Sequence, residues 1–335
     1  MKLKFSQSIL AATVLLGLPS LVLGQTATTK PVGFQSVTLK SGVFNLVGVN
    51  FLKAPVVVGL LDSLNAGSIT DADVDFSTAL AGQSNLVIEI TSGPGVGLWA
   101  NVSAPTSTQV TVDTDLTATV TGGAAYQIFS LPTISDIFGA TNSAGLKGGL
   151  PTAADVIWLS TGNGSGSYDK YYYSLGAPFG LGWRKVGGGT ANQAGEPVYH
   201  HEAMIIERRD VSDLTVTFAG TVKTSPTAVP VFTGFNFIER SFPTLATLSN
   251  SGISAYLGGG LPSGAATDIV WIPNGSGAYD KYYVSTGAPF GVGWRKVGGG
   301  TTDASSTALS SGIIIERKGA NTNIKIMPDA AYSSL

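Results

Sequence analysis

One stretch of the chain occurs twice, and this repeat constrains the fold more than any other feature. Residues 163–190 read NGSGSYDKYYYSLGAPFGLGWRKVGGGT, and residues 274–301 read NGSGAYDKYYVSTGAPFGVGWRKVGGGT. The two stretches lie 111 residues apart and are identical at 24 of their 28 positions. Because an internal repeat of this kind indicates repeated structural units, we expect two related domains.

Shorter motifs extend the repeat on both sides. PTI at 132–134 corresponds to PTL at 243–245, ADVIW at 154–158 to TDIVW at 267–271, and IIER at 205–208 to IIER at 314–317. These motifs predict a first unit at 123–219 and a second at 234–335, joined by a Thr- and Pro-containing linker at 220–233. Residues 25–122 lack a GWRKVG motif and are expected to form a separate N-terminal β-domain. A weaker likeness of 44–59 to 235–248 leaves open that this domain is a divergent copy.

The local pattern predicts strands almost throughout. Short apolar or alternating runs are broken by Gly, Pro, Asn and Ser, which is typical of strands and tight turns. Short helices are expected only at 134–138 and 245–248. We therefore predict an all-β fold with tandem β-sandwich-like or barrel-like repeats and an N-terminal β-domain. The first predicted strands lie at 36–39, 44–49, 56–61, 86–91, 98–102 and 109–112.

The N-terminus has the features of an export signal. Two lysines precede an apolar run at 9–23, and small residues precede Gln25, so residues 1–24 are expected to be a cleaved signal peptide. The run is shorter than the roughly 20 residues of a membrane-spanning helix, which disfavours a retained anchor. We expect an exported protein at an extracellular, cell-surface or periplasmic location, and not an integral membrane protein.

Composition narrows the classes of function. Only 12% of the residues are charged and the net charge is −2, which disfavours a nucleic-acid partner because such proteins usually carry a basic surface. The chain has no cysteine, so disulfides and thiolate chemistry are excluded. A weakly charged surface favours self-association.

The repeated aromatic residues are the candidate binding residues. Alternation along a strand places Tyr168 and Tyr172 on one face together with Lys170. Aromatic rings beside hydrogen-bonding side chains are what a sugar-binding face requires. The alternative is that one face is core and the other carries cross-strand aromatic pairs. The candidate glycan-binding residues are Tyr168, Tyr172, Trp183, Tyr279, Tyr283 and Trp294.

The repeated charges are expected to pair with each other. Asp169 with Arg184, and Asp280 with Arg295, are the candidate cross-strand ion pairs, because charges are rare here and these recur in both units.

Asp71, Asp73 and Asp75 alternate, which favours one solvated strand face. A calcium loop would also need a Gly and a Glu that are missing.

The sequence contains no convincing catalytic motif. The Gly-rich segments lack the Lys-Ser/Thr of a phosphate-binding loop, and adjacent His200 and His201 point apart on a strand and rarely chelate one metal. Asp155, Asp169 and Glu196 could supply paired carboxylates, but nothing singles them out. We therefore expect neither an enzyme nor a cofactor or metal site.

The motifs also resemble a known family. GWRKVG, followed some twenty residues later by IIERR or IIERK and preceded by a Pro-Thr-Ile/Leu segment, is similar to an uncharacterised exported family found chiefly in verrucomicrobial bacteria. The resemblance implies a signal peptide and a β-rich body, but no functional residue. One copy of the motif is usual in that family, so the duplication is a departure.

These observations lead to two hypotheses. The first is an exported, non-enzymatic structural or cell-surface protein that assembles with itself, as a homo-oligomer or filament, through strand edges or aromatic faces. The alternative is a carbohydrate-binding protein with two equivalent aromatic sites for an extracellular polysaccharide.

Overall fold

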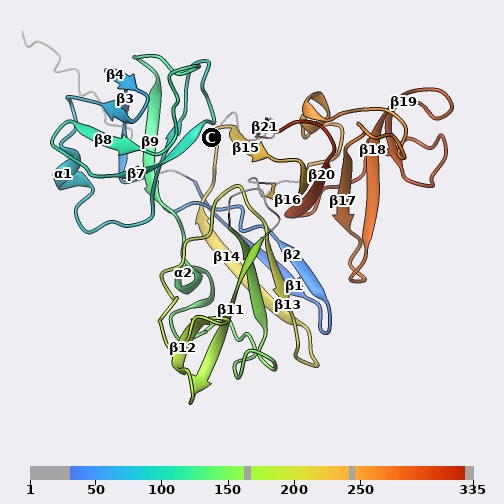
Figure 1. The fold of residues 1–335 in the computed structure, drawn as a ribbon, viewed down its shortest axis with the longest axis horizontal. Helices are drawn as coiled ribbons and strands as arrows, with labels where there is room; N and C mark the ends of the chain where they lie inside the picture. The colour runs from blue at the N-terminus through green and yellow to red at the C-terminus, as the bar shows by residue number, and fades with distance from the viewer. Residues whose placement is uncertain (1–30, 162–166, 241–245, 329–335) are drawn as a thin grey trace, which may run out of the picture.

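The computed structural model describes residues 31–161, 167–240 and 246–328, and it is built mainly of antiparallel strands (Figure 1). The predicted all-β fold is confirmed. The strands form two five-stranded sheets, one seven-stranded sheet and two two-stranded ribbons, all with linear strand orders. The predicted signal peptide at 1–24 lies outside the described residues and stays a prediction.

The first copy of the repeat is assembled from two separate parts of the chain. Its five-stranded sheet has the order β12-β11-β10-β13-β2, and its ribbon pairs β1 with β14. The strands are β1 (Val32–Leu39), β2 (Phe44–Val47), β10 (Val156–Ser160), β11 (Tyr168–Gly176), β12 (Gly180–Lys185), β13 (Met204–Glu207) and β14 (Leu214–Thr221).

The second copy is continuous and has the same strand order. Its five-stranded sheet is β19-β18-β17-β20-β16, and its ribbon pairs β15 with β21. A short 3-10 helix, η1 (Ile253–Tyr256), lies between β16 and β17. The strands are β15 (Thr227–Val231), β16 (Gly234–Glu239), β17 (Ile269–Pro273), β18 (Tyr279–Gly287), β19 (Gly291–Lys296), β20 (Gly312–Arg317) and β21 (Thr322–Ile326).

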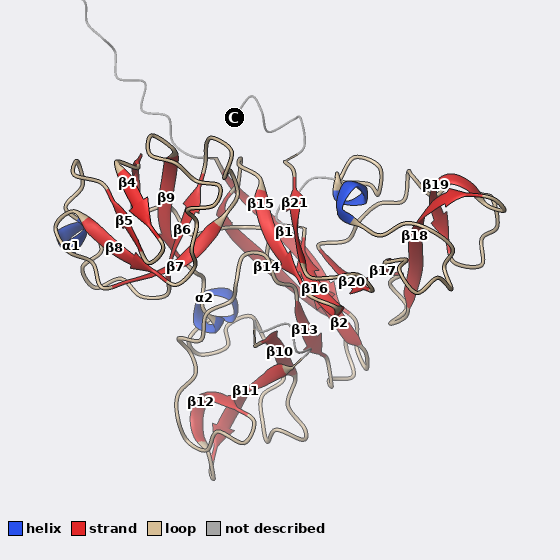
Figure 2. Cartoon of the chain, turned by 45° about the horizontal axis from the view of Figure 1, so that its top comes forward, coloured by secondary structure: helices blue, strands red, loops and turns tan. Residues whose placement is uncertain are grey.

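A third unit, which we call the insert, interrupts the first copy between β2 and β10. Its seven-stranded sheet has the order β3-β9-β6-β7-β8-β5-β4 and a core of its own. Figure 2 shows the insert on one side of the β1–β14 ribbon and strands β17, β18 and β19 of the second copy on the other. The elements are β3 (Val57–Leu60), β4 (Ser63–Asn65), β5 (Ser68–Thr70), α1 (Phe76–Ala79), β6 (Leu86–Ile90), β7 (Trp99–Ser103), β8 (Gln109–Val112) and β9 (Ala125–Ser130).

These pairings correct the predicted domain boundaries. β1 and β2, expected in a separate domain at 25–122, complete the first copy by pairing with β14 and β13. β9, expected in the first repeat, lies between β3 and β6 of the insert. The expected linker at 220–233 contains the end of β14 and all of β15. Boundaries drawn along the sequence failed because the first copy is discontinuous.

The likeness between 44–59 and 235–248 reflects the equivalence of β2 and β16. The side-chain amide of Asn45 donates to the carbonyl oxygen of Ile206 at 3.3 Å, and that of Asn236 donates to Ile315 at 3.2 Å. Both acceptors belong to the IIER strand of their copy. The likeness therefore marks the second strand of each copy and not a third copy.

The core of the first copy lies between the ribbon, helix α2 (Ile134–Phe138) and the inner face of the five-stranded sheet. α2 starts at Thr133, where a reciprocal capping box with Asp136 satisfies the first free amides. The predicted helix at 134–138 is confirmed. The one expected at 245–248 is not present over 246–248, and residue 245 lies outside the described residues.

The two copies pack against each other by a reciprocal contact. The amide of Ala203 in the first copy donates to the carbonyl oxygen of Phe237 in the second at 3.1 Å. The equivalent residues, Gly312 and Leu46, meet so closely that a Cβ atom on Gly312 would lie 2.9 Å from the Leu46 side chain. A contact in which the same surfaces meet from both sides is isologous and closes on itself. The copies therefore form an internal dimer.

Candidate functional site

Four of the six predicted glycan-binding residues are buried. Trp183 and Trp294 lie in the cores of their copies, 0% and 4% exposed. Tyr172 and Tyr283, each 1% exposed, lie on the opposite sheet face, across from Arg184 and Arg295 on the neighbouring strand. Because none presents a ring to solvent, the prediction that these four bind a sugar is wrong for the folded chain.

The other two residues, Tyr168 and Tyr279, are half-buried on the outer sheet faces. Each neighbours a tryptophan, Trp158 or Trp271, which carries a lysine ammonium 3.8 Å from its ring centroid. Tyr168 also packs edge-on against Phe237 of the second copy at 5.0 Å. This aromatic row therefore helps to hold the two copies together.

The arginine of each GWRKVG motif covers the edge of its own strand. Arg184 Nε donates to the carbonyl oxygen of Phe179 at 2.7 Å, and its two Nη atoms donate to Leu181 and Trp183, both at 2.8 Å. Arg295 repeats this arrangement with the carbonyls of Phe290, Val292 and Trp294. The Trp183 and Trp294 carbonyls also accept the backbone amides of Gln193 and Ala304. Without the arginines, the other carbonyls would be open to a strand from another chain.

The glycines of GLGWR make this arrangement possible. Gly180 and Gly182 have φ values of 80° and 122°, which L side chains rarely adopt. A Cβ atom on Gly180 would lie 3.0 Å from Arg184 Nη2. The glycines thus curl the strand around the guanidinium group and leave room for it. The turn before them contains a cis peptide bond between Ala177 and Pro178, and the second copy has the same bond at Pro289.

The repeated acids pair with lysines and not with these arginines. Asp169 lies 2.6 Å from Lys185 Nζ, and Asp280 lies 2.7 Å from Lys296 Nζ. The predicted partner Arg184 lies opposite Tyr172, on the other face of the sheet. The predicted Asp169–Arg184 and Asp280–Arg295 pairs are therefore wrong.

A second set of repeated charges is buried. Asp155 pairs with Arg208 and also accepts the backbone amides of Lys147 and Arg209 at 2.8 and 2.7 Å. Asp268 pairs with Arg317 in the same way. These pairs join the ADVIW and IIER strands to the neighbouring loops, which explains why both motifs recur.

The triple-aspartate segment is a turn and not a strand. Asp71 is buried and accepts the Tyr126 hydroxyl at 2.6 Å, whereas Asp75 caps the first turn of α1. Asp71, Asp73 and Asp75 therefore do not share a solvated strand face. Within the described ranges, no group of three or more His, Asp or Glu residues could hold a metal ion.

An acidic pocket of about 250 Å³ lies in the first copy. Asp169, Glu196 and Glu202 line it together with Tyr171 and Tyr199. Burial raises the pKa of Glu202 to about 7. In the second copy, Thr307 occupies the position of Glu196, and Ser311 occupies that of Glu202.

His200 and His201, which lie between the pocket residues Tyr199 and Glu202 in the sequence, are buried. Their rings pack against Trp99 of the insert, with centroids 5.5 and 4.6 Å away. Burial lowers the pKa of His201 to about 3, so this histidine is neutral at ordinary pH. The two histidine rings therefore form part of the packed contact between the insert and the first copy.

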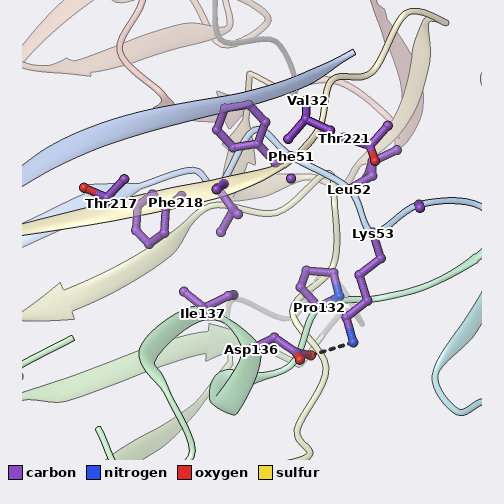
Figure 3. Close-up of a pocket in the computed structure, with 14 residues that line it drawn as sticks. Val32, Phe51, Leu52, Lys53, Pro132, Asp136, Ile137, Thr217, Phe218 and Thr221 are labelled. Carbon is purple, nitrogen blue, oxygen red and sulfur yellow. Dashed lines mark ion pairs between the residues drawn. The ribbon is translucent and has the colours of Figure 1, made fainter. Parts of the chain in front are cut away.

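A depression lined largely by apolar residues lies beside α2, and we call it the groove (Figure 3). It has a volume of about 330 Å³ and lies between α2, the end of the β1–β14 ribbon and the segment that leads into the insert. Phe51 and Phe218, each 3% exposed, form part of its lining. Ile137 and Val32 line it from α2 and β1 (Figure 3).

One ion pair lies in the groove. Lys53 Nζ lies 2.7 Å from Asp136 Oδ2, and both side chains are 40% exposed. Asp136 Oδ2 also accepts the backbone amide and the hydroxyl of Thr133, at 2.8 and 2.7 Å. The carboxylate therefore keeps two donors if the ammonium turns to another anion.

No motif in the sequence indicates this groove. Asp136 is recognisable as the acid of the Thr-x-x-Asp capping box, but that signal concerns the helix and not a site. Lys53 is followed by Ala-Pro in a segment without a motif. The groove forms because residues near 52 and 220 pair across the chain, with Leu52 bridged to Thr221.

Comparisons with protein-family models, curated proteins and solved structures found no match to this chain. Within the described ranges, no helix combines the length and the apolar character needed to cross a membrane.

Proposed function

We propose that the protein is an exported, non-enzymatic structural or cell-surface protein that associates with its own copies through two apolar hairpin tips. The repeated residues support a structural role because they serve as core, buried ion pairs and edge covers in both copies. Neither the covered strand edges nor the buried aromatic residues offer a contact surface, so the self-association is assigned to a different part of each repeat.

The tip of the β11–β12 hairpin is the observation that carries this proposal. Leu175 and Leu181 lie directly opposite each other and are 65% and 66% exposed. Leu150, 49% exposed, belongs to a loop whose Gly148 lies next to Leu175. Contiguous exposed apolar groups are typical of protein interaction sites.

The β18–β19 hairpin carries a related tip. Val292 is 76% exposed and lies opposite Thr286, and Leu261 in the equivalent loop is 45% exposed. The two hairpins project in different directions (Figure 1). A chain with two separate contact patches can bridge two neighbours, which is the requirement for a filament or network.

The test is sedimentation velocity of the mature protein over a wide concentration range. Association is expected for the native chain, and Leu175→Ser with Leu181→Ser is expected to reduce it. Val211→Ser is the control, because Val211 is 94% exposed but lies outside the tips. Monomers at every concentration, or equal association of all variants, would contradict the proposal. Export is tested separately by fractionation and by an N-terminus at Gln25.

The carbohydrate-binding alternative is weakened because four of its six candidate residues are buried. Its two remaining residues, Tyr168 and Tyr279, lie in aromatic rows next to the junction of the copies. A glycan array would restore this alternative if it detected a sugar whose binding Tyr168→Ala and Tyr279→Ala abolish.

A further inference from the structure

The groove has the size and lining of a site for one alkyl chain. A water molecule takes about 30 Å³ in the liquid, and a methylene group is of similar size, so about 330 Å³ accommodates roughly ten such groups. Ten of the fourteen lining residues are apolar or glycine, which resembles the apolar lining of small-molecule sites. Thr217 and Thr221 are the only uncharged polar residues among them.

Lys53 supplies an anchor for an anionic head. Its ammonium group has three donors, lies in the groove and has Asp136 as its ion-pair partner. Asp136 retains its hydrogen bonds from Thr133 when Lys53 moves. An incoming carboxylate or phosphate therefore gains a charged donor without leaving an unpaired carboxylate behind.

We propose that the groove binds a single acyl or alkyl chain with an anionic head, the chain lying along Phe51, Phe218 and Ile137 and the head on Lys53. The sequence at the equivalent positions makes this site a property of the first copy alone. Asp136 corresponds to the uncharged Asn250, whose side-chain oxygen accepts the amide of Thr247 as Asp136 accepts that of Thr133. Lys53 lies in the segment that enters the insert, which the second copy lacks. This proposal does not rest on self-association through the hairpin tips.

The test is calorimetric titration of the mature protein with decanoate, decyl phosphate and the neutral decyl maltoside, each below its micelle concentration. Decanoate and decyl phosphate are expected to bind more tightly than decyl maltoside. Lys53→Met is expected to weaken both anions about tenfold and to leave decyl maltoside unchanged. Ile137→Glu, which places a carboxylate in the groove, is expected to abolish binding of the anions.

Lys40→Met is the matched control. Lys40 forms an ion pair of 2.8 Å with Asp213 at the other end of β1 and is 52% exposed, so this variant should bind like the native protein. Failure of every ligand to bind, or equal binding by native protein, Lys53→Met and Ile137→Glu, would overturn the proposal. Phosphatidylglycerol and phosphatidylcholine vesicles distinguish the sources. If the protein binds the anionic vesicles and this binding depends on Lys53, the natural ligand is a membrane lipid. If it binds only monomeric decanoate, the natural ligand is a free fatty acid.

Discussion

Arg184 Nε donates a hydrogen bond of 2.7 Å to the carbonyl oxygen of Phe179, five residues earlier in the same hairpin. The bond turns the arginine back along its own strand, where its guanidinium group occupies the edge carbonyls of Phe179 and Leu181, which an added strand could otherwise use. Arg295 does the same with Phe290. The most recognisable motif of the chain thus protects a sheet edge.

Replacing Arg184 by methionine is expected to lower the free energy of unfolding by about 1–3 kcal/mol, because three carbonyl groups lose a charged donor. It should also increase aggregation through the uncovered edge. Urea denaturation and light scattering measure the two effects. Arg184→Lys should not restore stability, since one ammonium cannot reproduce the planar fork of the guanidinium.

Lys185→Met serves as the control for that variant. It removes a neighbouring charge whose ion pair with Asp169 is about one-third exposed, and such pairs contribute about 0–1 kcal/mol. If Arg184→Met and Lys185→Met lowered the free energy of unfolding equally, the loss of a positive charge, and not the uncovering of the edge, would explain the destabilisation.

Asp155→Asn is expected to destabilise the first copy by about 3–5 kcal/mol, because it leaves the Arg208 guanidinium buried without its counter-charge. Asp268→Asn should act similarly on Arg317 in the second copy. Thermal unfolding with both variants tests this equivalence. If Asp155→Asn destabilised the protein no more than Asp169→Asn does, the buried Asp155–Arg208 pair would not have the stabilising role assigned to it.

The stability of the contact between the copies should depend on pH. Burial raises the pKa of Glu202 to about 7 and that of Glu239 to about 8, from ordinary values of 4.5. Between pH 4.5 and 8 the folded chain therefore binds more protons than the unfolded chain, and the free energy of unfolding falls as the pH rises. The slope is at most about 1.4 kcal/mol per pH unit for each group.

Glu202→Gln should flatten this dependence and stabilise the protein at pH 8 relative to the native chain. Glu202 forms a bridge with Ile238 of the second copy, so the effect should appear in the unfolding of both copies. Urea denaturation at pH 5 and pH 8 measures the difference. A native protein whose stability rises over this range would contradict the assignment.

The insert, produced alone as residues 55–131, is expected to unfold cooperatively. Its ends are adjacent, with the amide of Val56 donating to Ile128 at 2.8 Å, and its core is separate. In the whole chain, buried Glu89 pairs with Lys223 of the segment after β14. Glu89→Gln should therefore stabilise the isolated insert but destabilise the full chain. Thermal melts of the four proteins test this reversal of sign.

Local features of the fold were predictable from the sequence. The helix at 134–138 follows from the capping signal at Thr133, and the early strands follow from alternation between turn residues. The inner face of β11 also follows from alternation, since Tyr171 and Tyr173 do share the core with Trp183.

Features that depend on register or on distant pairing were not predictable. The pairing of Tyr171 with Lys185 across β11 and β12 decides that Asp169 meets Lys185 and not Arg184, and no composition rule provides that register. The groove likewise depends on contacts between residues near 52, 136 and 220, which only the folded chain brings together.

The interruption of the first copy has a consequence for the order in which the protein folds. Ser36 and Thr217, which hydrogen-bond at 2.9 Å across the ribbon, lie 181 residues apart. During synthesis, β1 and β2 are made long before β13 and β14 exist, and the insert is complete before either partner appears. Domains generally fold as units in the order of synthesis. The insert is therefore expected to fold before the first copy, and β1 and β2 find their partners only after β13 and β14 have been synthesised.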